Sequence, residues 1–146
     1  MLKRLLYIAI FTFSLQSCRT IEYIPDYSSV EVLNTKEYFK EEKEFTLIMT
    51  AGVGCGYCNQ AMKDLLIFDK SPKLNIVVAE FGNPMTIKRY HQRYLDKYLF
   101  INPKDGSVFP NDFYPIFQLY KGKELIWGYE GYKKEHIVKI KSYLKE

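Results

Sequence analysis

The sequence predicts a single α/β domain in which helices flank a mixed β-sheet. Short apolar runs typical of buried strands alternate with segments whose apolar residues recur at helical spacing, and this order indicates parallel strand pairing. Two strand-like runs near the C-terminus are separated only by residues 121–123 (KGK), which predicts a hairpin and therefore an antiparallel edge. A chain of 146 residues has room for one such domain.

Residues 1–17 are predicted to be an export signal that is removed. Lys3 and Arg4 form a positive start, and residues 5–15 (LLYIAIFTFSL) form an apolar core. This core has the length of a secretory signal, ~7–15 residues, and is shorter than the ~20 that span a bilayer. Removal of Lys3 and Arg4 leaves 19 of the 21 basic residues against 17 acidic ones, a net charge of +2. That balance argues against a nucleic-acid-binding protein, which would carry a basic face.

Residues 15–18 (LQSC) resemble the lipobox of bacterial lipoproteins, in which the cysteine is acylated and becomes the new N-terminus. Gln16 departs from the small or aliphatic residue that is usual there. A lipid on Cys18 would explain the odd count of 3 cysteines, because it leaves Cys55 and Cys58 as one pair. We therefore expect an exported, membrane-anchored protein that faces the periplasm or the cell exterior. The alternative is an ordinary signal peptide followed by a chance cysteine.

The domain is expected to cover residues 30–146. Residues 18–29 before it show no sustained hydrophobic periodicity and are predicted to be a tether. Its first part should contain a weak strand, a short charged helix preceded by Asn34 as its cap, a buried strand, and a helix that Pro72 ends. Gly52 and Gly54 mark the turn between the buried strand and the second helix. The four elements are predicted at residues 30–33, 36–43, 45–50 and 56–69.

The second part of the domain should begin with another buried strand, followed by a helix that starts at Asn83 and Pro84. A turn at residues 102–106 belongs to an irregular excursion over residues 101–113, to which the sequence assigns no role. The hairpin strands and a closing amphipathic helix complete the domain. These strands and helices are predicted at residues 74–81, 84–98, 116–120, 124–129 and 133–145.

The candidate chemistry lies on Cys55 and Cys58, which are separated by Gly56 and Tyr57 and follow a buried strand directly before a helix. The free N–H groups and partial positive charge of a helix N-terminus stabilise a thiolate, and cysteine pKa values at such places fall to ~3.5–7.5. The two residues between them let the thiol of Cys58, on the first helical turn, fold back within disulfide reach of Cys55. We expect Cys55 to attack from the helix tip and Cys58 to resolve the mixed disulfide.

The cysteine pair could also serve other purposes. A purely structural disulfide remains open, although so short a loop would stabilise the fold weakly. A zinc site would need about four ligands, and the remaining candidates, His91 and His136, have no ligand spacing. Attachment of a c-type haem is excluded, because it needs a histidine where Asn59 stands. We expect neither a metal site nor a cofactor.

The chain resembles the thioredoxin superfamily over residues 30–146. The resemblance rests on the strand–CGYC–helix unit, on residues 114–122 (YPIFQLYKG), and on a glycine, Gly128 or Gly131, before the closing helix. It implies a three-layer sandwich with a central mixed sheet, a redox-active disulfide between Cys55 and Cys58, and a cis proline beside it. Carried over, that proline is Pro115, and the backbone of Tyr114 would pair with the substrate, with Gly56 and Tyr57 also at the binding surface.

Departures from the family pattern are informative. Met49 replaces the buried aspartate that thioredoxins carry before the first cysteine, and Gly54 replaces an aromatic residue. Glu80 aligns with the lysine of the next strand, so it is either the replacement proton acceptor for Cys58 or a solvated charge at a strand end. The Gly-Tyr pair is similar to that of periplasmic disulfide isomerases, whose N-terminal dimerisation domain this chain has no room for.

Three further residues are assigned to structural roles. His91 lies among Tyr90, Arg93 and Tyr94 on a predicted helix and is interpreted as solvated or stacked. His136 lies in the closing helix, away from any constellation, and Trp127 is expected in the core.

Together these features predict a membrane-tethered thiol–disulfide oxidoreductase with Cys55, Cys58 and Glu80 as its catalytic residues. Its expected partners are the thiols and disulfides of exported proteins and an unidentified redox donor protein, with the reductase or isomerase direction favoured. We expect a monomer that binds the membrane through its lipid and does not bind nucleic acid. The alternative is a redox-inactive or chaperone-like binding module of the same fold that presents a partner protein.

Overall fold

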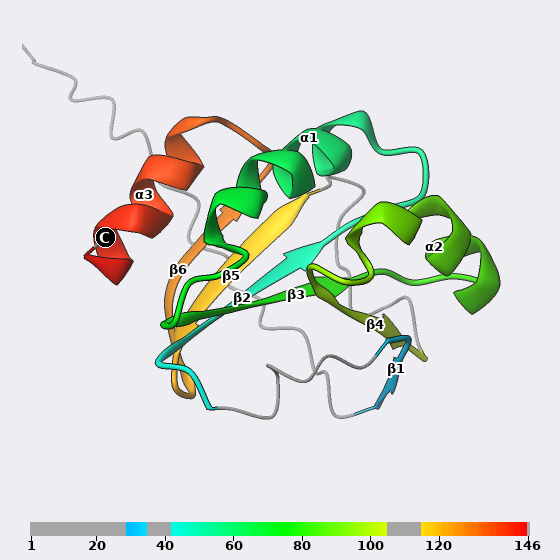
Figure 1. Cartoon of the computed structure of the whole chain (residues 1–146), viewed down its shortest axis with the longest axis horizontal. Helices are drawn as coiled ribbons and strands as arrows, with labels where there is room; N and C mark the ends of the chain where they lie inside the picture. Colours follow the sequence, from blue (N-terminus) through cyan, green and yellow to red (C-terminus); the bar gives the residue numbers. More distant parts are fainter. Residues whose placement is uncertain (1–28, 35–41, 105–114, 146) are drawn as a thin grey trace, which may run out of the picture.

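The computed structural model describes residues 29–34, 42–104 and 115–145. The strands of these residues form one six-stranded sheet in the order β1-β4-β3-β2-β5-β6 (Figure 1). The predicted signal, Cys18, the tether up to residue 28 and most of the helix expected at residues 36–43 lie outside the described residues. The strands are β1 (Val30–Val32), β2 (Phe45–Thr50), β3 (Leu74–Ala79), β4 (Leu99–Pro103), β5 (Ile116–Lys121) and β6 (Glu124–Glu130).

The sheet is mixed, as predicted. β3 pairs in parallel with both β2 and β4, while β5 is antiparallel to β2 and to β6, and β1 is antiparallel to β4. The predicted hairpin at residues 121–123 thus adds antiparallel strands on one side of β2. At the opposite edge of the sheet, β1 adds a further antiparallel strand beside β4.

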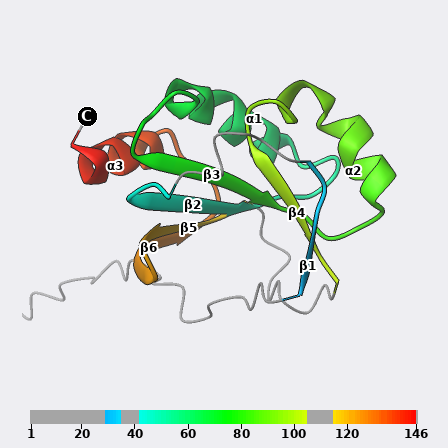
Figure 2. The same ribbon diagram turned by 60° about the horizontal axis from the view of Figure 1, so that its bottom comes forward.

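The helices of the described residues are α1 (Gly56–Asp64), α2 (Pro84–Tyr90) and α3 (Glu135–Leu144), with short 3₁₀ turns at Leu65–Phe68 and Gln92–Tyr94. All three α-helices lie on one side of the sheet (Figures 1 and 2). For α1 and α2 the reason is topological. The crossovers from β2 to β3 and from β3 to β4 step in the same direction, so right-handed connections place both helices on the same face.

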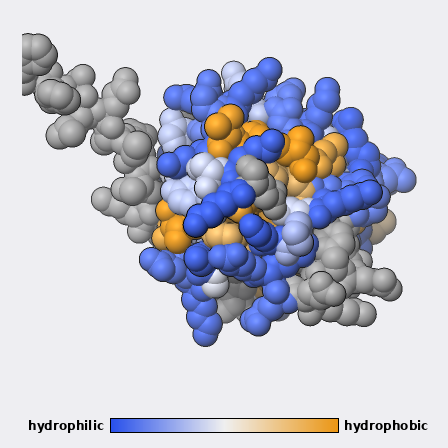
Figure 3. All heavy atoms as spheres, turned by 60° about the vertical axis from the view of Figure 1, so that its left-hand side comes forward, coloured by the Kyte–Doolittle hydropathy of each residue, from blue (hydrophilic) through white to orange (hydrophobic). Residues whose placement is uncertain are grey.

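The main core lies between the sheet and these helices. Alternate residues of β2, Leu47 and Met49, face the helices and are fully buried, as period-2 patterning requires. They pack with Phe117 and Leu119 of β5 and with apolar residues of α1 and α3. On the surface turned toward the viewer in Figure 3, by contrast, hydrophilic side chains predominate and apolar ones form small separate groups.

One strand was not predicted. Residues 101–113 were expected to be an irregular excursion, but residues 101–103 belong to β4, and residues 105–113 lie outside the described part. The helix expected at residues 84–98 is shorter than predicted, because α2 ends at Tyr90 and a separate 3₁₀ turn follows. After this turn, the side-chain amide of Asn34 donates to the carbonyls of Leu95 and Tyr98 at 2.6 and 2.7 Å. Its oxygen accepts from the N–H of Phe100, at 2.6 Å.

Candidate active site

The strand–turn–helix unit around the cysteines is formed as the sequence predicts. β2 ends at Thr50, and the N–H of Cys55 donates to the carbonyl of Gly52 at 3.1 Å, which closes the turn. Gly54 has φ +82°, a backbone conformation that favours glycine. This conformation explains why glycine stands at the position where thioredoxins have an aromatic residue. Cys55 is the N-cap of α1, and Cys58 lies in its first turn.

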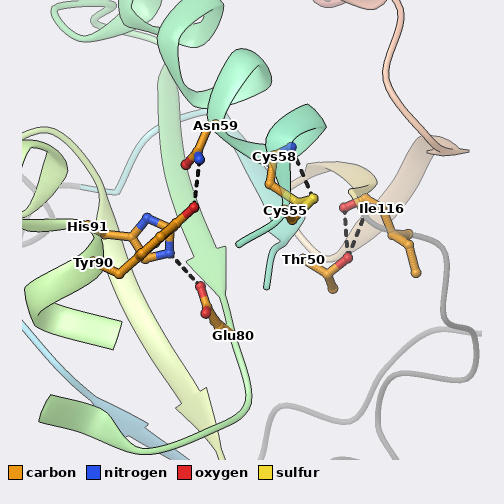
Figure 4. Close-up of a disulfide and its surroundings, with 8 residues drawn as sticks. All are labelled: Thr50, Cys55, Cys58, Asn59, Glu80, Tyr90, His91 and Ile116. Atoms are coloured by element: carbon orange, nitrogen blue, oxygen red, sulfur yellow. Dashed lines mark hydrogen bonds and ion pairs between the residues drawn. A yellow bond between two sulfur atoms is a disulfide. The ribbon is translucent and has the colours of Figure 1, made fainter. Parts of the chain in front are cut away.

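Cys55 and Cys58 form a disulfide whose Cα atoms are 5.3 Å apart. The N–H of Cys58 donates to the sulfur of Cys55 at 3.1 Å, so the helix N-terminus solvates that sulfur (Figure 4). The two residues differ in exposure: Cys58 is fully buried in the core, whereas Cys55 is partly exposed. A thiolate from outside would therefore reach the sulfur of Cys55 and not that of Cys58.

Among the described residues, those beside Cys55 are exposed. Gly56 is exposed, and Val53 and Tyr57 are exposed large apolar side chains, with Tyr57 retaining 71% of its accessible surface. Gly56 and Tyr57 were predicted to contact substrate, and their exposure next to Cys55 allows that contact.

Pro115 is buried and directly precedes β5. Its carbonyl accepts from the N–H of Gly131 at 2.7 Å. Thr50 fixes the next residue: its hydroxyl oxygen accepts from the N–H of Ile116 at 2.9 Å. Figure 4 places Thr50 and Ile116 beside the disulfide. Tyr114 lies outside the described residues, so its backbone role and the isomer of the Tyr114–Pro115 bond stay predictions.

Glu80 and His91 form a buried pair next to this region. Nε2 of His91 lies 2.6 Å from Oε2 of Glu80, and their side chains are only 0% and 2% exposed. Glu80 follows Val78 by two positions, and because Val78 belongs to the core beneath the helices, Glu80 turns to the same face. The interpretation of Glu80 as a solvated strand-end charge is therefore wrong.

For His91, the solvated alternative is wrong and the stacked one is right. Its ring stacks on Phe100 with centroids 5.2 Å apart, and Tyr90 meets it edge-on at 4.8 Å. Sequence reasoning missed both the burial of His91 and its contact with Glu80, although a signal for the burial existed. His91 follows the buried Ile87 by four residues, so both lie on the inner face of the α2 segment.

Two hydrogen-bonding atoms of this pair have no hydrogen-bond partner among the described residues: Oε1 of Glu80 and Nδ1 of His91. Buried polar atoms of this kind are rare, and each calls for a physical explanation. Nearby, the amide of Asn59 donates to the hydroxyl of Tyr90 at 2.8 Å and links α1 to α2 one residue after Cys58. Figure 4 shows this link, the buried pair and the disulfide in one view.

His136 occupies a different kind of site, in an aromatic cluster that also contains Phe117, Trp127, Tyr129 and Tyr132. These four rings surround it at centroid distances of 4.2–6.2 Å. His136 lies in α3, the closing helix in which it was expected, but the aromatic cluster around it was not predicted. Trp127, expected in the core, is half-buried at its edge. Burial lowers the pKa of His136, Lys133 lowers it further, and Glu135 partly offsets them.

In the described parts of the chain, no helix is long and apolar enough to span a bilayer. The same residues contain no cluster of three or more side chains that could hold a metal ion.

No protein-family model and no curated protein matches the sequence. Solved structures do match the fold. A thiol-disulfide isomerase from Corynebacterium glutamicum aligns with TM-score 0.61 and 11% identity over 90% of this chain and 99% of its own. A putative thiol:disulfide interchange protein DsbE from Chlorobium tepidum aligns with TM-score 0.61 and 10% identity, over 83% of this chain and 94% of its own. An exposed lipoprotein thioredoxin from Streptococcus pneumoniae aligns with TM-score 0.57 and 9% identity, over 70% of this chain and 85% of its own. At such identities the likeness shows the fold, and it confirms the predicted fold class.

Proposed function

We propose that this chain, which has the fold of the thioredoxin superfamily, is a thiol–disulfide oxidoreductase that works through Cys55 and Cys58. One observation carries the proposal: the two cysteines are joined at the N-terminus of α1 with Cys55 at the surface and Cys58 in the core. A disulfide used only for structure would need no such asymmetry. An exchange reaction does, because one sulfur must meet the substrate while the other waits behind it.

The reaction would run in two steps. The thiolate of Cys55 attacks a substrate disulfide, forms a mixed disulfide and releases one substrate sulfur as a thiolate. Cys58 then attacks the sulfur of Cys55, gives up its proton, and releases the second substrate sulfur. The substrate gains two electrons, the chain ends as the observed disulfide, and a redox donor protein must reduce it again.

Substrate would bind over the exposed side of Cys55. The exposed Gly56 and Tyr57 offer contact surface there, and the backbone of Tyr114, ahead of the buried Pro115, would pair with an extended substrate segment. The Gly-Tyr pair between the cysteines supports the reductase or isomerase direction, through its likeness to the pair of periplasmic isomerases.

The proposed substrates are exported proteins, and the proposed anchor is a lipid on Cys18. The export signal and lipobox-like LQSC sequence support this, as does the match to a fold relative described as an exposed lipoprotein. Cys18→Ala should release the protein from the membrane fraction or block its processing. Unchanged membrane association of that variant would contradict the lipid anchor.

Turnover separates an oxidoreductase from a binding module of the same fold. The full-length protein should catalyse reduction of insulin disulfides by dithiothreitol, monitored as insulin precipitation. Cys55→Ser should lower the rate to that of dithiothreitol alone, because the attacking sulfur is gone. A wild-type rate equal to this background would support a redox-inactive binding module and contradict the proposal.

A further inference from the structure

We propose that the outer face of α3 is a membrane-contact surface that binds the anionic headgroups of a lipid bilayer. The inference goes beyond thiol–disulfide exchange, because it concerns how the domain lies on a membrane and uses no residue of the candidate active site. It takes from the proposed function only the lipid anchor on Cys18, which would hold the domain to that bilayer.

α3 presents a stripe of exposed residues on the side away from the sheet. Successive members of the stripe are three or four residues apart, so they lie on one face of the helix. The members, which we call the lysine face, are Lys134, Val138, Lys141 and Lys145. The opposite face of the helix is buried through His136, Ile140 and Leu144.

The positive charge of the chain without its predicted signal is concentrated in this segment. Residues 133–146 contain five lysines and two glutamates, a net charge of +3. Residues 18–132 contain 14 basic and 15 acidic residues, a net charge of −1. A helix face that contacts only water needs no such separation of charge. An anionic bilayer, by contrast, attracts a one-sided cluster of lysines.

The contacts of the lysines in this segment differ. Lys133 lies over the ring of Tyr129, at 5.6 Å from its centroid. Lys139 lies over the ring of Tyr143, at 5.1 Å. Among the described residues, no salt bridge holds the three ammonium groups of the lysine face, so they can bind an external anion. Val138, between these lysines, is 68% exposed, and an apolar side chain flanked by lysines suits the boundary between headgroups and acyl chains.

The positive surface continues onto the end of α1. Hydrogen bonds from Tyr132 and Gln60 lower the pKa of Asp64, and the charges of Lys134 and Lys63 lower it further. Lys63 is exposed and therefore adds a second lysine close to the start of the lysine face. Figure 3 brings the side with α3 forward, and hydrophilic side chains predominate on it.

The direction of α3 leaves the disulfide free when this face is occupied. Nζ of Lys73 donates to the carbonyl of Leu144 at 2.9 Å, and Lys73 directly precedes β3. Because β2 and β3 are parallel, the C-terminal end of α3 lies where both strands begin, whereas Cys55 follows the other end of β2. No described element lies over the outer side of α3 (Figure 1). A bilayer on the lysine face would therefore leave Cys55 open to a substrate.

The chain before the domain is long enough for the lipid and the lysine face to reach one bilayer. The hydroxyl of Tyr143 lies 3.5 Å from the carbonyl oxygen of Ile126, which places α3 beside β6. The described domain begins with β1, at the other edge of the sheet. Six strands spaced about 4.8 Å apart span about 24 Å. The 12 residues 18–29 can extend to about 40 Å, which exceeds that width.

The first test changes the lipid headgroup and keeps the anchor. The protein purified with its lipid is reconstituted into vesicles of phosphatidylcholine, either alone or with an equal part of phosphatidylglycerol. A membrane-impermeant acetylating reagent modifies exposed lysines, and mass spectrometry measures the rate at each one. Lys134, Lys141 and Lys145 should react about fivefold more slowly on the anionic vesicles, and high salt should remove the difference. Lys88 and Lys104, in α2 and after β4, should react equally on both.

The second test removes the anchor. Cys18→Ser, prepared from residue 18 as processing would leave it, should sediment with the anionic vesicles and not with phosphatidylcholine alone. In that background, the triple variant Lys134→Gln, Lys141→Gln, Lys145→Gln should bind the anionic vesicles about 10²-fold more weakly, because each lysine near an anionic surface contributes about fivefold.

The matched control for the triple variant removes the same charge from the other side of the domain. Arg89→Gln, Arg93→Gln and Lys104→Gln change exposed residues on α2, after α2 and after β4, and together they should leave vesicle binding unchanged. Thermal unfolding and insulin reduction of both triple variants should match those of the parent protein, which excludes a general loss of structure.

The outcomes separate this surface from the proposed function. Equal acetylation of the lysine face on both kinds of vesicle, or equal vesicle binding by the two triple variants, would overturn the membrane-contact surface. Protection of these lysines on native membranes but not on anionic vesicles would overturn the lipid as occupant and indicate an acidic protein. Protein that stays on vesicles only when phosphatidylglycerol is present would contradict the lipid anchor and support the surface. Absence of insulin reduction would contradict the exchange function alone.

Discussion

The structure buries two histidines, and their surroundings differ in kind. His91 contacts the carboxylate of Glu80, and each residue of that pair retains an atom without a partner among the described residues. His136 contacts four aromatic rings, and its Nδ1 accepts from the N–H of Lys133 at 3.2 Å. Burial alone therefore does not indicate function. The pair of Glu80 and His91 has polar atoms without a partner among the described residues, whereas the aromatic cluster around His136 is explained by packing.

The same contrast holds for the two acidic residues of these regions. Glu80 is buried, whereas Asp64, at the end of α1, is partly exposed and accepts hydrogen bonds from Tyr132 and Gln60. These hydrogen bonds, that of Tyr132 first, lower the pKa of Asp64, and burial together with the bond to Asp64 raises the pKa of Tyr132. Asp64 and Tyr132 join α1 to the segment before α3, which is a structural role. Variants of the two regions should accordingly change different measurements.

The largest expected contrast concerns the cysteines. In the reduced protein, Cys55 should react with iodoacetamide at least about tenfold faster than Cys58 at pH 7, because Cys55 is partly exposed at the helix tip and Cys58 is fully buried. Rates measured on Cys58→Ser and Cys55→Ser report each thiol by itself. Equal rates would remove the asymmetry on which the exchange mechanism depends.

Tyr132→Phe should have the next largest effect. It should lower the stability of the fold and leave the rate of thiol–disulfide exchange unchanged. Loss of a hydrogen bond to a partly exposed carboxylate should lower the free energy of unfolding by about 1 kcal/mol in urea. This contribution is present above the ordinary Asp64 pKa of 3.8 and is lost as the pH falls below it. Tyr57→Phe, at an exposed tyrosine, is the control for the stability measurement alone. A slowed thiol exchange in Tyr132→Phe, with stability unchanged, would contradict the division between the two regions.

The smallest expected effect is the pH dependence that His136 contributes. Because its folded-state pKa lies below 6.5, the unfolded chain takes up a proton first as the pH falls. The free energy of unfolding should therefore decrease below about pH 6.5, and His136→Phe should show a smaller decrease between pH 7.5 and 5.5. Both are measured by urea unfolding. An equal or steeper decrease in the variant would show that His136 gains its proton as readily in the folded state.

Local features were predicted well from the sequence. The β2 strand, the turn at Gly54 and the start of α1 after Cys55 depend on residues adjacent in the chain, so patterning and capping rules predict them. β4 was missed because its short apolar run, Leu99 to Ile101, is followed by Asn102 and Pro103, which are typical of a turn. Its strand pairing depends on β1 and β3, which are distant in the chain.

The buried pair shows the same limit of local reasoning. Glu80 was a candidate because of its position on the strand after the cysteines, but its partner could not be identified from spacing. His91 comes from the end of α2, and its approach to Glu80 requires the crossover from β3 to β4 to be folded. The position of His91 relative to Ile87 indicated burial, and only the tertiary structure supplied the acidic partner.

The most direct measurement of the central claim is trapping of a mixed disulfide. Reduced Cys58→Ser should form a covalent complex with a disulfide-containing substrate that dithiothreitol reverses, because Cys55 can attack and nothing resolves the product. Mass spectrometry should place the link on Cys55, and Cys55→Ser should form far less complex, because the buried Cys58 cannot reach the substrate. Attachment through Cys58, or no complex with either variant under conditions in which dithiothreitol itself exchanges with the substrate, would contradict the account.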